Sequence, residues 1–300
     1  MTGEAAIAGR RPMPAADAAA RSTRPAPAGR ARRRAAALPR WQQVAIGLVF
    51  PAVVVAVWQY VGQNEMLARG LFPSFTKSVD AAVDFLVGHR GTSPYSGEWL
   101  VHVGSSFHRI MIGYGLGALV GIVLGLGVGF YRTMRLALHP TINAIRPVSI
   151  TAWIPLTLII LGIGNKPAYF LTALATFFPV YLNSMLGAMY ADGGLVRAAQ
   201  MLGASRRRIL FMVTLPAAMP NIAAGLRVAL ALAWTCVVVA EMLGARSGIG
   251  YVLIDSYTQF RLDYVIACMF TLGVLGTASD RVLAWILRAR LRWVEIGAKS

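Results

Sequence analysis

The chain has 300 residues, of which 57 % are hydrophobic and 14 % charged, and its mean hydropathy is +0.59. These values exceed the usage of soluble proteins and predict an integral membrane protein, all-α and polytopic. A net charge of +17 is typical of nucleic-acid binders, but its uneven distribution argues against that class, and we expect no nucleic-acid partner.

Residues 1–40 hold nine of the 29 basic residues, only two acids, and much alanine and proline. Such a segment cannot bury apolar area, so we interpret it as a disordered basic tail in the cytoplasm. An organelle transit peptide has a similar Arg-rich, acid-poor composition and stays as the alternative. A cleaved signal peptide fits less well, because the first apolar stretch begins only after residue 40.

Six apolar stretches are long enough to cross about 30 Å of hydrocarbon, which takes about 20 residues. Residues 41–106 contain the first of them and an outer interfacial segment, residues 107–293 form a core with the other five, and residues 294–300 are a cytoplasmic end. The turn Gly164–Pro167 makes a helical hairpin of the third and fourth. The six predicted spans are residues 44–61, 107–130, 148–164, 167–190, 217–243 and 264–287.

Orientation follows from the Lys and Arg residues that flank these spans, because cytoplasmic loops are enriched in them. With the N-terminus inside, twenty basic residues flank the inner side and six the outer side. The sequence therefore predicts that both termini and the stretch 197–216 lie in the cytoplasm.

Residues 74–88 have apolar side chains at helical spacing, at Val79, Ala82, Val83 and Leu86. They predict a short amphipathic helix, either on the outer membrane surface or packed on its own domain.

The second span repeats glycine every four residues, a pattern that lets two helix backbones approach closely in lipid. The repeat consists of Gly113, Gly117, Gly121, Gly125 and Gly129.

Sites for catalysis, nucleotides or metals are not indicated. None of the three lysines follows a glycine, as a P-loop requires, and the four histidines have no metal-ligand spacing. No G-x-S-x-G motif occurs either. We expect a transport protein without a cofactor or metal, not an enzyme, with energy supplied by a partner or a gradient.

The stretch "RAAQMLGASRRRILFMVTLP", residues 197–216, is too charged to span a membrane. Ala199 and Gly203 leave one helix face bare, Gly203 can end that helix, and Ser205 can cap a second one. Pro216 is expected to stop the second helix. A short bare helix at the cytoplasmic surface suits a groove on another protein, and an ordinary basic interfacial loop is the equal alternative.

The stretch resembles the coupling motif of permease subunits of bacterial ATP-binding-cassette importers, E-A-A-x3-G-x9-I-x-L-P. Arg197 replaces the acid and Val213 the isoleucine, and the first change puts one contact with the ATPase in doubt. With "LFPS", "AWTCVVVAEM" and "GIGYVLIDS", the match covers about residues 71–293 and is similar to the nitrate/sulfonate/taurine/bicarbonate group. The matched residues that the resemblance assigns to coupling are Arg197, Ala198, Ala199, Gly203, Ala204, Arg207, Leu215 and Pro216.

The resemblance implies a bacterial inner-membrane permease that works with a second copy of itself, two cytoplasmic ATPase subunits and an extracytoplasmic solute-binding protein. It implies that ATP-driven closure of the ATPase pair turns the pore outward through the stretch 197–216.

Charged residues inside spans are costly in lipid and are functional candidates by default. Arg227 and Asp280 are expected at similar depth, so we predict a structural ion pair, with a substrate contact by Arg227 as the alternative. Glu241, about 21 Å along the helix from Arg227, is expected at an outer gate or at the lipid headgroups. The residues expected to line the translocation pathway are Trp153, Pro155, Phe178, Arg227, Trp234 and Glu241, beside Pro179.

We therefore predict the pathway-forming subunit of an importer for a small anion such as sulfonate, taurine, nitrate or bicarbonate. An importer permease of the same fold for a non-anionic molecule is one alternative. An ion-gradient-driven secondary transporter is another, although paired mid-span acids and inverted repeats are not seen in the sequence.

Overall fold

The computed structural model describes residues 40–64, 71–88, 91, 93–191 and 193–290, and these contain helices and no strand. The predicted tail up to residue 39 and the predicted end 294–300 lie outside the described residues. The chain divides after Val53 into two units, and the arrangement below concerns the second, from Val54 on. In chain order the elements are α2 (Arg40–Gln63), α3 (Phe75–Val87), α4 (Trp99–Phe130), α5 (Arg132–Ile145), the 3-10 turn η2 (Ile150–Trp153), α6 (Ile154–Leu161), α7 (Asn165–Met189), α8 (Gly193–Met201), α9 (Arg206–Ile209), the π-helical turn η3 (Leu210–Thr214), α10 (Leu215–Gly244), α11 (Ile249–Thr258) and α12 (Leu262–Arg290).

Among the described residues, four helices are long and apolar enough to cross a membrane: α4, α7, the continuous helix Arg206–Gly244, and α12. They confirm the second, fourth, fifth and sixth predicted spans, although α4 begins at Trp99 and not at residue 107. The first predicted span, 44–61, lies within α2, of which Val49–Gln63 is a shorter apolar helix.

The third predicted span, 148–164, is wrong as a straight helix. Its residues form η2 and α6, and together with α5 they make a broken pair bent by 86°. Pro147 lies at the break, and because proline has no backbone N–H it cannot continue the hydrogen-bond ladder of α5. Gly162, with φ +74°, then ends α6, which lies against α7. The bent pair counts as a fifth candidate span, so the described residues support four or five spans where six were predicted.

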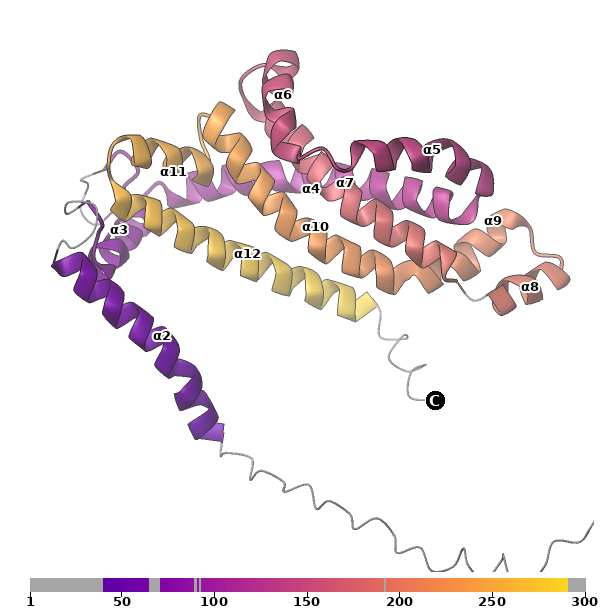
Figure 1. The fold of residues 1–300 in the computed structure, drawn as a ribbon, viewed down its shortest axis with the longest axis horizontal. Coiled ribbons are helices and arrows are strands. Elements are labelled where there is room, and N and C mark those ends of the chain that lie inside the picture. The colour runs from indigo at the N-terminus through magenta and orange to yellow at the C-terminus, as the bar shows by residue number, and fades with distance from the viewer. Residues whose placement is uncertain (1–39, 65–70, 89–90, 92, 192, 291–300) are drawn as a thin grey trace, which may run out of the picture. The chain divides into compact units, whose positions relative to one another are not determined.

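The glycine repeat of α4 makes a close helix contact, as predicted, and its partner is α7. A Cβ atom placed on Gly113 would lie 2.6 Å from Cβ of Thr172, and one on Gly129 would lie 2.5 Å from Cβ of Ala188. The backbones are therefore too close for any side chain at these positions. The other face of α7 packs on α10, and these three helices form the centre of the bundle (Figure 1).

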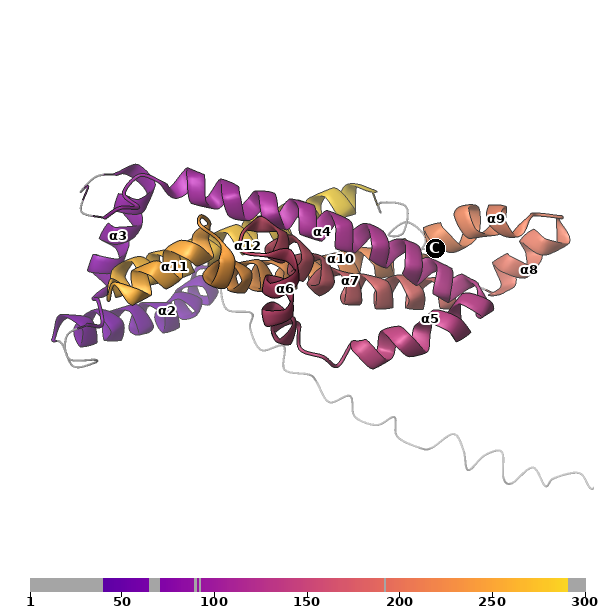
Figure 2. The ribbon, with the colours of Figure 1, turned by 90° about the horizontal axis from the view of Figure 1, so that it is seen from above.

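The two ends of the bundle carry different short helices (Figures 1 and 2). At one end, α3 packs on α12 and α4, and α11 lies beside α12. At the opposite end, α8 and α9 project beyond α7 and α10. Helix α3 buries Ala81 and Phe85 in the domain and exposes the apolar side chains of Val79, Val83 and Leu86. It therefore packs on its own domain and presents an apolar stripe outward.

Candidate functional site

The segment 197–216, hereafter the coupling segment, contains the turn that its sequence predicts. Helix α8 ends at Met201, and Gly203 adopts φ +75°, a conformation that side-chain-bearing residues rarely adopt. Ser205 then begins α9, because its hydroxyl accepts a hydrogen bond from the backbone N–H of Arg208 at 3.4 Å. Two short helices thus meet at a fixed turn.

The tip of this turn is apolar and exposed. Met201 and Leu202 are 82 % and 87 % exposed, while Ile209 is buried and fastens α9 to the bundle. Large apolar side chains that lie together at the surface are candidates for contact with a partner. The motif residues Arg197, Ala198, Gly203 and Arg207 are exposed beside this tip, and Ala199 and Ala204 are half-buried.

Pro216 does not stop the helix, contrary to expectation. The backbone runs on from α9 through η3 into α10, and Pro216 occupies the first turn of α10. In η3 the N–H of Leu215 bonds to the carbonyl of Leu210, five residues back. This wider π turn accommodates the residue that cannot donate a hydrogen bond, so the helix continues without a kinking break.

Arg227 and Asp280 lie side by side on α10 and α12. Arg227 Nε donates to Asp280 Oδ1 at 3.0 Å and Nη2 donates to Oδ2 at 2.7 Å, a bidentate ion pair. The two side chains are 47 % and 40 % exposed in the single chain. A charged pair on membrane-spanning helices is costly against lipid, so this face is expected to meet protein or water.

The other residues expected along the pathway divide into two groups. Pro155 is exposed at the start of α6, and Trp153 and Phe178 are half-buried. Trp234 is buried between α10 and α12, where its Nε1 donates to Ser279 Oγ at 2.9 Å. Trp234 therefore packs between these two helices.

Glu241 is fully buried and paired with Arg109 of α4, so it does not contact lipid headgroups, while its place at an outer gate stays a prediction. Arg109 Nη1 donates to Glu241 Oε1 at 2.6 Å, while Ser106 Oγ and the Gly250 N–H donate to Oε2 at 2.9 and 3.0 Å. Arg109 also donates to the carbonyl of Ser247 at 2.8 Å. The pair therefore joins α4, α10 and the turn before α11.

Sequence reasoning missed Arg109, although a signal was present. Arg109 is the third residue of the predicted second span and Glu241 the third from the end of the predicted fifth. Both span ends are predicted to face the outer side, so a positive and a negative charge were to be expected at the same depth in the membrane. The rule that charges inside spans need partners applied to both.

The end of the bundle that carries α3 and α11 also holds a polar cluster. The Tyr95 hydroxyl donates to Asp255 of α11. Burial, and next this hydrogen bond, raise the pKa of Tyr95 well above its usual range, so the phenol stays neutral and keeps donating. The Gly248 N–H donates to His102 Nδ1 at 3.1 Å, which ties the turn before α11 to α4.

Comparison with known proteins agrees with this architecture. Residues 117–292 match the family of binding-protein-dependent transport system inner membrane components. A putative ABC transporter permease protein from Methanocaldococcus jannaschii is 34 % identical over 82 % of this chain and 90 % of its own length. A putative aliphatic sulfonates transport permease protein from Bacillus subtilis is 32 % identical (82 % and 87 %), and the taurine transport system permease protein of Escherichia coli is 32 % identical (85 % and 90 %).

A solved structure supports the fold independently. The MetNI methionine ABC transporter in inward-facing conformations aligns with a TM-score of 0.51 and 17 % identity, over 63 % of this chain and 96 % of that chain. The helical bundle, the coupling segment and the similarity over most of its length agree, and the chain belongs to the family of binding-protein-dependent transport system inner membrane components, the membrane permeases of ABC importers.

Proposed function

We propose that this permease pairs with a second copy of itself to form the pathway for a small anion of the sulfonate class. A solute-binding protein delivers the anion outside the membrane, and two ATPase subunits bind from the cytoplasm. Relatives named for sulfonates and taurine support the anion class. The carrying observation is the coupling segment, whose exposed Met201 and Leu202 stand on a turn fixed by Gly203.

The orientation proposed has both termini in the cytoplasm. It rests on the twenty inner and six outer basic residues, and on the position of α8 and α9 at the end of the bundle opposite α3 and α11 (Figure 2). In this orientation the α8–α9 turn faces the ATPase, and the exposed apolar stripe of α3 lies at the outer surface.

The substrate path is proposed along the face that carries Arg227 and Asp280. The bidentate pair uses Nε and Nη2 of Arg227 and leaves Nη1 outside the pair. A guanidinium that keeps a free donor while its charge is balanced can attract an anion without trapping it. Trp153, Pro155 and Phe178 are proposed along the same path, and Trp234 and Glu241 as packing and anchoring residues behind it.

The test is ATP hydrolysis by the permease assembled in liposomes with its cognate ATPase, stimulated by loaded binding protein. We expect Ala199→Phe and Gly203→Phe to leave the permease dimer in the membrane and to abolish the stimulation, because a ring on this face obstructs docking of the ATPase. Gly203→Asn should stay coupled, since asparagine tolerates positive φ at little cost and adds little bulk. Gly104 lies near the start of α4, away from the segment 197–216, and a Cβ atom placed there meets nothing within 4 Å. Gly104→Phe therefore adds the same ring at a distant site and is the matched control.

Two results would contradict the proposal. Full stimulation in both phenylalanine variants would show that the segment 197–216 does not couple the pore to ATP. Uptake by the permease alone, driven by an ion gradient and indifferent to ATP, would establish the secondary transporter. Arg207→Ala should be milder than either phenylalanine variant, since a rim charge mainly tunes association and its salt dependence.

A further inference from the structure

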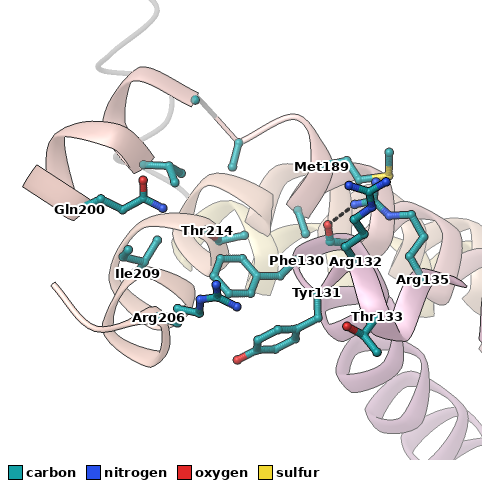
Figure 3. A pocket seen from close by; sticks show the side chains of 15 residues that line it. Phe130, Tyr131, Arg132, Thr133, Arg135, Met189, Gln200, Arg206, Ile209 and Thr214 are labelled. Carbon is teal, nitrogen blue, oxygen red and sulfur yellow. Dashed lines mark hydrogen bonds between the residues drawn. The ribbon is translucent and has the colours of Figure 1, made fainter. Parts of the chain in front are cut away.

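A cavity of about 530 Å³ lies between the coupling segment and the bundle, where the proposed orientation places the inner membrane surface. One wall is the corner at which α4 passes into α5, and the other is formed by α8, α9 and η3 (Figure 3). The coupling motif does not require such a cavity, and the pathway proposed above does not use it.

Arginines from both walls line the cavity. Figure 3 shows Arg206 on one side and Arg132 and Arg135 on the other, with the rings of Phe130 and Tyr131 between them. The described residues that line it include no carboxylate. Asp192 lies next to the lining residues in the chain but outside the described part, and one carboxylate cannot neutralise three guanidinium groups.

The three arginines differ in what they already bind. Arg135 Nε donates to the carbonyl of Val128 at 3.2 Å and its Nη2 to that of Gly129, so it satisfies the end of α4. Arg132 and Arg206 are exposed, and their guanidinium groups make no hydrogen bond or ion pair with any described residue. Thr214, 1 % exposed, also lines the cavity, and its Oγ1 has no hydrogen-bond partner.

From this arrangement we propose that the cavity binds a phosphate-class oxyanion that bridges the coupling segment to the α4–α5 corner. Guanidinium groups bind such oxygens through charge-assisted hydrogen bonds, often in pairs. The volume falls in the range of small-molecule sites and exceeds the needs of one bare oxyanion, so the anion should carry a substituent. Two sources share this chemistry: the headgroup of an inner-leaflet anionic phospholipid, and a free phosphate ester of the cytoplasm.

The apolar surroundings favour the lipid headgroup. Met189 lines the cavity and is 44 % exposed, and Phe211 and Met212, 64 % and 69 % exposed, follow on η3. Acyl chains can lie on these side chains while the headgroup meets the arginines. Basic pockets between membrane helices on the cytoplasmic side are a known lipid-binding arrangement. This source rests on the proposed orientation, whereas the anion site itself does not.

The test uses the purified permease–ATPase complex in a zwitterionic detergent. Binding of radiolabelled inorganic phosphate is measured, with competition by short-chain phosphatidylglycerol, short-chain phosphatidylcholine and glycerol 3-phosphate. In Arg132→Gln/Arg206→Gln, each lost charge-assisted bond should weaken anion binding about ten-fold. Arg208→Gln removes an arginine of α9 that does not line the cavity and should bind as the unaltered chain does.

Competition by phosphatidylglycerol far below the concentration needed for glycerol 3-phosphate assigns the site to lipid, and equal competition assigns it to the free ester. Either result supports the anion site. If the double variant fails to assemble, Arg206→Gln and Arg206→Lys are compared, and only the first should lose affinity. Equal anion binding by the glutamine variants and Arg208→Gln, or no binding at all, overturns the proposal. Neither result bears on ATP coupling, which Gly203→Phe tests separately.

Discussion

The buried pair of Arg109 and Glu241 can be tested by a double-mutant cycle. Glu241→Leu leaves Arg109 without a counter-charge in the protein interior, and removal of one partner of a buried ion pair costs about 3–5 kcal/mol. The Gly250 N–H also loses its acceptor, which adds about 1–3 kcal/mol. Arg109→Met leaves the Glu241 carboxylate with only the Ser106 and Gly250 donors, and we expect a similar loss of about 3–5 kcal/mol.

The double variant Arg109→Met/Glu241→Leu should be far less harmed than the sum of the single variants. An apolar pair of similar volume replaces both charges, and such replacements are often neutral or stabilising. Glu241→Gln should lose stability as Glu241→Leu does, because hydrogen-bond donors face both carboxylate oxygens and the amide nitrogen of glutamine would face one of these donors.

The assay is the unfolding midpoint of the purified permease in detergent, where each single variant should lower Tm by about 10 °C. Arg246→Met, at an exposed arginine of the same turn, should leave Tm unchanged. If the single losses are below about 1 kcal/mol and add in the double variant, the pair carries no coupling energy and the reasoning fails.

Three further predictions can each be checked with a variant or a fusion of the chain. Gly125→Ala should cost about 1–3 kcal/mol, because its Cβ would lie 2.5 Å from the Tyr181 carbonyl oxygen, whereas Gly104→Ala should stabilise α4 by up to about 1 kcal/mol; a thermal shift of equal sign in both would contradict the packing. Asp280→Asn should lower the rate of transport but change Tm little, since it removes the charge that balances the exposed Arg227. Unchanged uptake kinetics would show that this pair does not belong to the pathway. A phosphatase reporter fused to the C-terminal end should be inactive, as only an extracytoplasmic fusion is active, and activity there would reverse the proposed orientation.

Local patterns in the sequence predicted those parts of the structure that short-range physics determines. The five glycines of the repeat predicted that α4 packs closely on another helix, because small residues let two helix backbones approach in lipid, and the structure supplies α7 as the partner. Gly203 and Ser205 predicted the turn and cap of the coupling segment for the same kind of reason.

Features that depend on the packing of distant segments were not predictable in this way. The bend before α6 depends on Pro147 together with the bundle it turns against, and hydropathy alone read the region as one span. The π turn before Pro216 is not indicated by any residue pattern in the sequence. The partner of Glu241 stands 132 residues away on α4, so only an argument from equal membrane depth would have found it.

The helix that begins at Arg206 does not end until Gly244 and is 39 residues long. At 1.5 Å per residue it is a rod about 58 Å long. Its lower end is part of the α8–α9 turn, its middle carries Arg227, and its upper end carries Glu241, fastened to α4. In the proposed orientation and coupling role, a movement of the α8–α9 turn would reach the outer side through one continuous helix, with no joint between separate helices on the way. Within this helix the π turn η3, where the N–H of Leu215 bonds five residues back, departs from α-helical geometry.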